Sequence, residues 1–174
     1  MTYWEGIIAC LALIVSTMST IVIYKTFKLQ RTHNIKMIKP IIQVSQWDYE
    51  NNLLIDLRNN GLGPAHVDKV TVFKNELEEK TCVYHWLPQK LPGTMNYKEY
   101  WTGYEKFIVP TNTIFKLIEI PVDTEVKKQV KCREEIRSIL RQLKIKIEYS
   151  DLYGNRMETY LKPFWVFSRS DNEN

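Results

Sequence analysis

The sequence contains few of the residues that build disulfide frameworks or compact metal and catalytic sites. It has three cysteines and three histidines in 174 residues. Cys10, Cys82 and Cys132 form no CxxC pair and no even framework, which argues against a disulfide-rich secreted module. Because the His-Glu-x-x-His, P-loop and nucleophile-elbow patterns are also missing, we expect no enzyme, no cofactor and no metal site. The alternatives left open are a polar pocket around His66 or His85 and a thiolate pair of Cys82 with His85.

Charge is missing from one long stretch near the N-terminus. The 19 residues from Gly6 to Tyr24 carry no charged side chain, and no acidic residue occurs between Glu5 and Asp48. At about 1.5 Å per residue this run is about 28 Å long, close to the hydrocarbon thickness of a bilayer. A cleaved signal peptide would have a basic n-region and a small-residue cleavage site, so residues 1–24 are predicted to hold an uncleaved transmembrane helix. No second stretch approaches that length, which argues against a polytopic channel.

The cations that follow this run indicate its direction. Residues 25–39 are predicted to be a basic juxtamembrane linker with five cations, whereas no Lys or Arg precedes the run. The positive-inside rule then places the N-terminus outside and the C-terminal domain in the cytoplasm, as a single-pass protein of the inner cell membrane. Each cation near anionic lipid contributes about 1 kcal/mol, so the bilayer is an expected partner. The predicted lipid-facing basic residues are Lys25, Lys28, Arg31, Lys36 and Lys39.

Small residues recur every four positions within the predicted anchor. Ala12, Ser16 and Thr20 share one face of a helix. Small residues at this spacing allow helices to approach closely in lipid, and their hydroxyl groups can form hydrogen bonds between helices. This face is therefore a candidate for transmembrane self-association, and the alternative is an ordinary apolar span that tolerates hydroxyl groups.

The part of the chain beyond the linker carries no net charge. Without the five linker cations and Glu5, residues 40–174 hold 19 basic and 19 acidic side chains. The net charge of +4 of the whole chain therefore belongs to the segment next to the membrane. A domain without net charge lacks the basic footprint of a nucleic-acid-binding protein, so we expect no DNA binding.

Residues 40–167 show mainly the alternation that is typical of β-strands. Alternating segments separated by Asn-, Gly- and Pro-containing turns predict strands near residues 42–47, 53–58, 67–73, 113–122, 144–149 and 156–167. Within residues 125–143 the apolar positions instead cover about half of a helix circumference. The expected fold is mainly β: a transmembrane helix, then an antiparallel β-sandwich at 40–167 with one inserted amphipathic helix, and a polar tail at 168–174.

Two turn-rich segments carry a resemblance to a known group of proteins. Asn-Asn-Gly-Leu-Gly-Pro-Ala at residues 59–65 and Ile-Glu-Tyr-Ser-Asp-Leu-Tyr-Gly-Asn at residues 147–155 resemble segments of small bacterial single-pass membrane proteins with a cytoplasmic immunoglobulin-like domain. The likeness covers about residues 40–167. It implies an immunoglobulin-like sandwich and a single-pass topology, without a reaction. Some membrane-tethered β-domains of this general build serve as effectors or sensors in antiviral defence.

Aromatic residues concentrate in the segment from Tyr84 to Phe107. This segment of 24 residues holds seven of the 21 aromatic residues of the chain. Aromatic rings in a long loop supply rigid contact area, which is the composition of binding surfaces. The predicted partner or ligand surface consists of Tyr84, Trp86, Tyr97, Tyr100, Trp101 and Tyr104.

Three interpretations of this aromatic segment compete. In the first, its rings pack against the sandwich and hold the loop there. In the second, they form a surface for a protein partner or a second copy of the chain. In the third, they stack on the base of a nucleotide beside Lys90, Lys98 and Lys106. The leading hypothesis for the function is a non-enzymatic, membrane-anchored interaction module that presents its β-sandwich to a protein partner or homo-oligomer. The alternative is a nucleotide-sensing membrane effector whose transmembrane helices cluster on activation.

Overall fold

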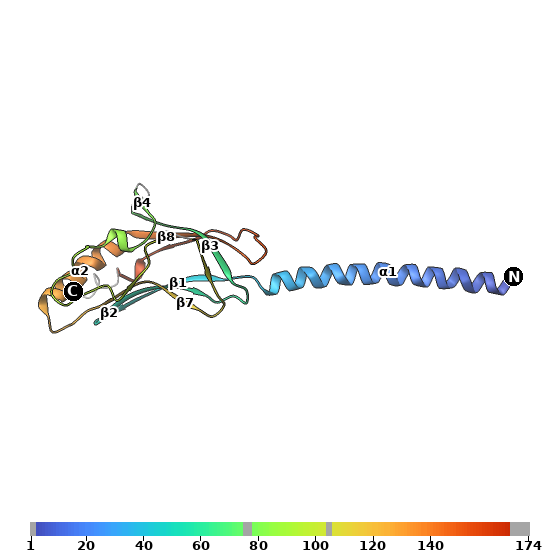
Figure 1. Cartoon of the computed structure of the whole chain (residues 1–174), viewed down its shortest axis with the longest axis horizontal. Helices are drawn as coiled ribbons and strands as arrows, with labels where there is room; N and C mark the ends of the chain where they lie inside the picture. Colours follow the sequence, from blue (N-terminus) through green and yellow to red (C-terminus); the bar gives the residue numbers. More distant parts are fainter. Residues whose placement is uncertain (1–2, 75–77, 104–105, 168–174) are drawn as a thin grey trace. The chain divides into compact units, whose positions relative to one another are not determined.

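The structure is a computed structural model that describes residues 3–74, 78–103 and 106–167. The chain divides into two compact units, residues 1–38 and residues 39–174. The first unit contains helix α1 (Tyr3–Met37), and the second contains two antiparallel β-sheets and helix α2 (Lys127–Leu140), as Figure 1 shows. The prediction of a long apolar helix followed by antiparallel sheets is therefore confirmed.

Helix α1 has 35 residues and none of them is buried. It is long and apolar enough to cross a membrane. The helix continues through residues 25–37, so most of the predicted linker is helical and only the last residues before the β-domain are not. The physical reason is that no Pro or Gly interrupts this stretch, whereas Pro40 disfavours helical backbone at Lys39.

The strands of the β-domain form two sheets in which neighbouring strands are antiparallel. The first sheet has the order β1 (Ile42–Tyr49), β2 (Asn52–Asn59), β7 (Ile114–Pro121) and β5 (Glu99–Tyr100). The second has the order β4 (Glu78–Lys80), β3 (Ala65–Lys74), β8 (Leu143–Ser150) and β9 (Tyr160–Pro163), and β6 (Phe107–Val109) also pairs with β3. Within the described residues, a 3-10 turn at Tyr84–Trp86 lies between β4 and β5.

Both sheets and helix α2 contribute to one hydrophobic core. In β1 the residues Ile42 and Val44 are buried and their neighbours face outward, as the period of two predicts. In α2 the buried Cys132, Ile136 and Leu140 are spaced by four, as an amphipathic helix requires. The inserted helix was predicted at residues 125–143, and it occupies the central part of that range.

The C-terminal strand is shorter than the alternation over residues 156–167 suggested. Strand β9 ends at Pro163, and the chain then places Phe164 and Phe167 in the core, where both are fully buried. Proline cannot donate a ladder hydrogen bond, which is consistent with a strand that ends there.

Side chains of β9 also cover the outer edge of β1. The backbone N–H of Val44 donates to the Tyr160 hydroxyl at 3.1 Å, and the carbonyl of Val44 accepts from Lys162 Nζ at 2.7 Å. Unpaired strand edges favour association with other chains, so these two bonds protect the edge and join the two sheets.

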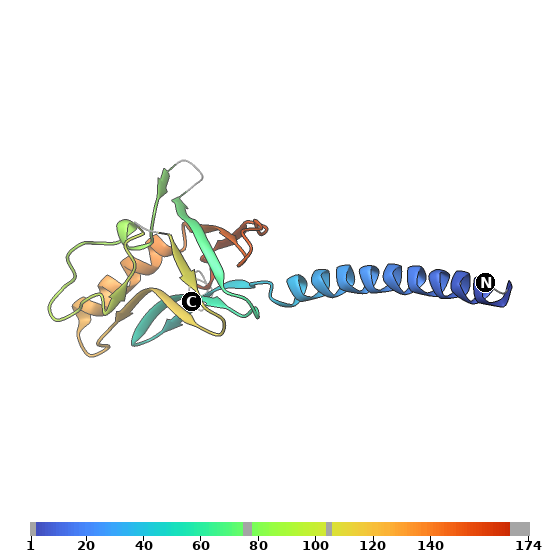
Figure 2. The same cartoon turned by 45° about the vertical axis from the view of Figure 1, so that its right-hand side comes forward.

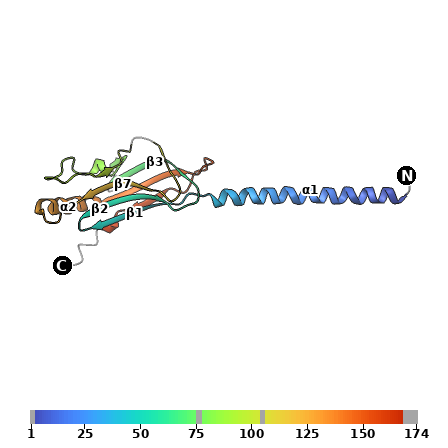
Figure 3. The ribbon, with the colours of Figure 1, turned by 60° about the horizontal axis from the view of Figure 1, so that its bottom comes forward.

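Helix α2 and one group of loops lie at opposite ends of the β-domain (Figure 2 and Figure 3). We call one the loop end; it consists of residues 39–41, where the chain approaches β1, and the loops at residues 60–64, 110–113 and 151–155. We call the other the helix end; it consists of α2 and the end of β1 at Asp48 and Tyr49. Strand register fixes this arrangement, since Ile42 pairs with Asn59 and His66 pairs with Ser150 at the loop end.

Candidate functional site

The predicted aromatic surface forms a ring cluster on the core. The rings of Tyr84 and Tyr100 stack with centroids 4.3 Å apart, and Tyr97 meets Tyr84 edge-on at 5.1 Å. Trp101 lies in a neighbouring group with Phe107, 5.1 Å between centroids. The structure thus brings Tyr84, Tyr97 and Tyr100 into direct ring contact, whereas Trp101 belongs to the neighbouring group and Tyr104 lies outside the described residues.

Most of these rings pack inward and one is displayed. Tyr84, Trp86, Tyr97 and Trp101 are partly buried against the hydrophobic core, whereas Tyr100 remains 48% exposed. The Tyr97 hydroxyl donates to the carbonyl of Pro88, and burial raises the pKa of Tyr97. The rings therefore hold the segment on the domain, and Tyr100 is the most exposed of the aromatic side chains described in it.

A shallow pocket of about 470 Å³ lies beside the exposed ring of Tyr100. Its cations are already engaged: Lys98 Nζ lies 3.1 Å from Glu119 Oε1, and Lys116 Nζ lies 2.6 Å from Glu119 Oε2 and 2.9 Å from Glu99 Oε1. The hydrogen bond from Lys116 is the largest cause of the lowered pKa of Glu119. Internal pairing removes the cationic attraction that a nucleotide phosphate would need here.

Cys82 does not have the environment of a thiolate nucleophile. The side chain is buried, and desolvation by burial is the largest cause that raises the pKa of its thiol. A catalytic cysteine needs the opposite shift, because the thiolate is the nucleophile.

The predicted self-association face lies on the exposed surface of α1. The Thr20 hydroxyl donates to the Ser16 carbonyl at 2.9 Å within the helix. Ala12 lies one turn before Ser16 on the same face. The four predicted lipid-facing residues Lys25, Lys28, Arg31 and Lys36 also belong to α1, and Lys39 follows its end.

Asn59 organises the loop end of the β-domain. Its side chain is fully buried and makes four hydrogen bonds to backbone groups. Oδ1 accepts from Ile41 N at 3.1 Å and Gly61 N at 3.0 Å, while Nδ2 donates to Gly63 O at 2.7 Å and Val109 O at 3.0 Å. One amide therefore joins the segment before β1, the β2–β3 loop and the end of β6, and uses its full donor and acceptor capacity.

The segment before β1 also packs tightly against Gly61. A Cβ atom at this glycine would lie 2.4 Å from Ile41 N and 2.4 Å from Lys39 O. Only glycine allows that approach, so Lys39 to Ile41 is held against the β2–β3 loop. The backbone of Asn59 extends the connection, since its carbonyl accepts from Asn112 N at 3.0 Å.

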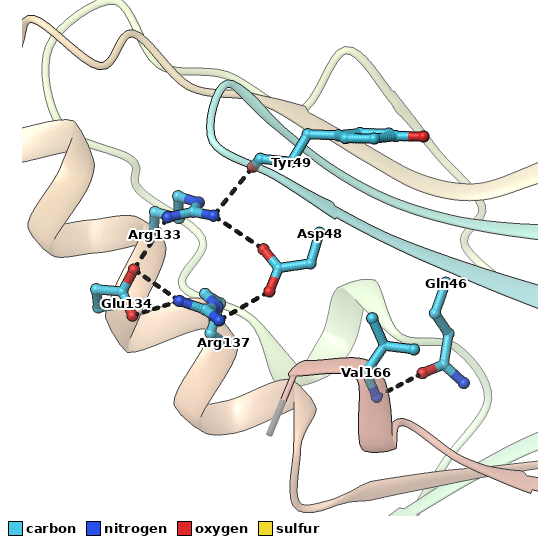
Figure 4. Close-up of polar contacts among 7 residues, drawn as sticks. All are labelled: Gln46, Asp48, Tyr49, Arg133, Glu134, Arg137 and Val166. Carbon is cyan, nitrogen blue, oxygen red and sulfur yellow. Dashed lines mark hydrogen bonds and ion pairs between the residues drawn. The ribbon is translucent and has the colours of Figure 1, made fainter. Parts of the chain in front are cut away.

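An ion-pair network closes the helix end (Figure 4). Asp48 accepts from Arg133 Nη2 at 2.9 Å and from Arg137 Nη2 at 2.8 Å, and Glu134 contacts both arginines. The side chains of Asp48, Arg133 and Arg137 are 10%, 14% and 10% exposed, so the network is largely desolvated. Arg133 also donates to the carbonyl of Tyr49 at 3.0 Å, which attaches α2 to the end of β1.

Neither of these two polar centres was predicted from the sequence. Asn59 and Asp48 each follow the inward positions of a strand at intervals of two, so alternation could have placed both toward the core. Arg133 and Arg137 each follow a buried residue of the α2 stripe by one position. Their burial could not be predicted from this position, because arginines beside an apolar stripe usually extend into water.

Comparison with known proteins identifies no family: no family model matches the chain, and no curated protein matches it. The assignment of a function therefore depends on the residues and contacts described above.

Proposed function

We propose that the chain is a single-pass membrane protein that presents a cytoplasmic β-domain to a protein partner and performs no reaction of its own. The observation that carries this proposal is α1, an apolar helix with no buried residue. An exposed apolar helix of this length is costly in water and stable in a bilayer. Tethering then confines the β-domain near the membrane and raises its effective concentration there.

The charge distribution supports the proposed orientation. All five cations among the first 39 residues follow the uncharged run, and four of them lie on the last turns of α1. Cations on one flank of a span favour the cytoplasmic side. The inner cell membrane and an outside N-terminus are parts of this proposal.

Strand order supports an immunoglobulin-like assignment of the β-domain. The order β1-β2-β7-β5 corresponds to strands A-B-E-D of a constant-type immunoglobulin sandwich, and β3-β8-β9 corresponds to C-F-G. Strand β4 then occupies the position of an additional edge strand beside C. Helix α2 lies in the connection between the strands that correspond to E and F.

The partner surface is proposed around Tyr100 at the β5 edge of the first sheet. Tyr100 is 48% exposed, and the neighbouring pocket also includes Ile114, which is 52% exposed. An exposed aromatic ring beside an apolar side chain is the composition that protein interfaces favour. The ring is already held by its stacking on Tyr84, so little conformational entropy is lost when a partner binds.

Two measurements test this proposal. For the anchor, the full chain should resist extraction from membranes by alkaline carbonate, and a reporter fused after Asn174 should be active in the cytoplasm. Extraction, or a reporter active on the other side, would refute the anchor or its orientation.

For the partner surface, a photo-crosslinking amino acid at Tyr100 in cells should give a discrete adduct. The same group at Leu161, which is 59% exposed on β9, should not. Adducts of equal yield at both positions, or none at Tyr100, would refute a specific surface.

A nucleotide ligand is the second candidate, and the displayed ring of Tyr100 is the observation that favours it. A nucleotide bound there would raise the melting temperature of the purified full chain. The pairing of Lys98 and Lys116 with Glu119 predicts no such rise across a nucleotide panel. A rise that is lost in Tyr100→Ala would instead establish the sensor and would support clustering of the membrane helices on activation.

A further inference from the structure

Apolar side chains occupy the tips of the loops at the loop end. Leu62 is 66% exposed, Ile41 56%, Leu152 53% and Tyr153 58%. Turn positions usually hold Gly, Asn, Asp or Ser, because these residues suit turn backbone and stay solvated. Single exposed apolar residues are ordinary, but several on adjacent loops at one end of a domain indicate a contact surface.

The same loops lack an exposed carboxylate. Residues 39–41, 60–64, 110–113 and 151–155 contain one acidic residue, Asp151, although residues 40–174 contain 19. Asp151 is buried, and its Oδ1 accepts from Tyr153 N at 2.9 Å and from Asn155 N at 2.8 Å. The cations Lys39 and Arg156 at the borders of these loops are exposed. The loops are therefore apolar at their tips and bordered by Lys39 and Arg156, and Arg156 shares a pocket with the carboxylates of Asp68 and Glu148.

The base beneath these tips is ordered by hydrogen bonds. Asn59 and Gly61 hold the chain before β1 against the β2–β3 loop, and the buried carboxylate of Asp151 shapes the β8–β9 hairpin. A contact surface built on such a base loses little conformational entropy when it binds.

We propose that the loop end is a lipid-contacting surface that docks on an anionic bilayer. Leu62, Leu152 and Tyr153 enter the headgroup region, where tyrosine rings prefer to lie, and Lys39 and Arg156 contact lipid phosphates. This inference rests on the proposed membrane anchor. The cations of residues 25–39 are attracted to the same anionic headgroups, which favours contact of the adjoining loop end with the bilayer.

Charge favours lipid over a second copy of the chain at this surface. A twofold contact between two loop ends would bring Lys39 and Arg156 of one copy toward the same cations of the other. Like charges in such a contact oppose association, whereas an anionic leaflet attracts them.

The test uses the full chain, one copy per nanodisc, with an environment-sensitive fluorophore on a single cysteine. The native Cys10, Cys82 and Cys132 are replaced by alanine, and the labelled variants are Leu62→Cys, Tyr153→Cys and, as matched control, Leu161→Cys on β9. In discs that contain phosphatidylglycerol, we expect a blue shift and a several-fold loss of acrylamide quenching at positions 62 and 153, and neither at 161. Both effects should weaken in pure phosphatidylcholine.

Probes at 62 and 153 that stay as quenchable as the probe at 161 would overturn the proposal. Shielding that appears only with two copies per disc would also overturn it and would assign the surface to self-association. With the probe at Leu152→Cys, the added change Leu62→Glu should restore quenching and Leu161→Glu should not. Carbonate extraction of the same samples separates the two proposals: extracted chain means the anchor fails, and integrated chain with accessible probes means only docking fails.

Discussion

At one end of the β-domain a neutral amide, Asn59, joins three backbone segments through four hydrogen bonds, whereas at the other end a carboxylate, Asp48, joins the first sheet to α2 through two arginines. Both centres are largely desolvated, and both close an end of the same core. The amide has no charge to balance, so its closure requires no counter-ion near the surface. The carboxylate requires Arg133 and Arg137, and they in turn contact Glu134.

The surfaces of the two ends also differ in charge, as their buried polar centres do. Around Asn59 the loops expose Leu62 and Tyr153 and no carboxylate, while α2 exposes charged residues of both signs. A mixed-charge helix surface stays in water, whereas an apolar tip without acids is suited to a lipid interface. The neutral buried centre is thus compatible with the lipid-contacting surface that we propose for the loop end.

The largest loss of stability at either end of the β-domain is expected on mutation of Asn59. Asn59→Ala removes four hydrogen bonds and leaves buried backbone groups without partners, so we expect a loss of about 4 kcal/mol in the free energy of unfolding. The measurement is urea unfolding of the purified chain in detergent. Asn60→Ala is the matched control, because Asn60 is exposed and its side chain donates one bond to Gln43. Equal losses of unfolding free energy in the two variants would show that Asn59 does not stabilise the loop end more than its exposed neighbour does.

At the helix end, Asp48→Ala should cost about 3 kcal/mol, because two largely buried arginines lose their carboxylate. The control is the same change in a background with Arg133→Met and Arg137→Met, because the resulting triple variant leaves no charge of this trio unpaired. There the added loss should fall below about 1 kcal/mol, as a double-mutant cycle by urea unfolding would show. A cost that is independent of the arginines would show that Asp48 acts through the shape of β1 instead.

The close approach at Gly61 gives the next effect in size. Gly61→Ala should cost about 2 kcal/mol, because the new methyl group would meet backbone atoms at 2.4 Å. Gly154→Ala is the matched control: its φ is +79°, but no atom lies within 4 Å of the added Cβ. Backbone strain alone should then cost about 1 kcal/mol. If both variants lose the same stability in urea unfolding, the contact with residues 39–41 contributes nothing.

The one carboxylate of the loop end gives a pH-dependent effect. Burial raises the pKa of Asp151, but hydrogen bonds from Asn155 and from the backbone of Tyr153 outweigh it and lower the pKa below its usual 3.8. A lowered folded-state pKa stabilises the fold fully above the unfolded value and loses that contribution as pH falls through the folded value.

Asp151→Asn should therefore cost about 1 kcal/mol at pH 7, and the difference from the wild-type chain should shrink below about pH 4. Urea unfolding at several pH values measures this. Glu158→Gln, at an exposed carboxylate near the same hairpin, is the control and should be nearly neutral. A difference at Asp151 that stays constant down to low pH would contradict the assignment.

Local signals predicted much of the fold. Alternation in β1 and β2 and the four-residue spacing of Cys132, Ile136 and Leu140 come from burial on one face, which a sequence displays directly. The two-residue strand β5 was not predicted, because it forms through pairing of Glu99 and Tyr100 with a distant strand. Pairing of that kind depends on the tertiary fold and leaves no periodicity in the sequence.

The candidate sites, too, were predictable only where local sequence signals were sufficient. Clustering of aromatic residues indicated the segment around Tyr84, but not which ring is displayed, because that depends on the stacking of Tyr84 on Tyr100. Asn59 looked like part of a turn, since Asn-Gly sequences are common in turns. Its central role depends on Ile41 and Val109, which the fold brings to it from 18 and 50 residues away.

The smallest expected effect concerns the exposed tips themselves. Leu62→Ser and Leu152→Ser should change the free energy of unfolding by less than about 0.5 kcal/mol, because neither side chain is buried in the domain. Leu57→Ser, at a fully buried leucine of β2, is the control and should be severely destabilising. Urea unfolding in detergent measures all three. A loss above about 1 kcal/mol at Leu62 would mean that the tip supports the fold. If both tip variants are neutral, folding does not require these leucines, and a contact outside the domain is the remaining explanation for them. The loop tips would then differ from the polar residues of the helix end, which we expect to be needed for stability.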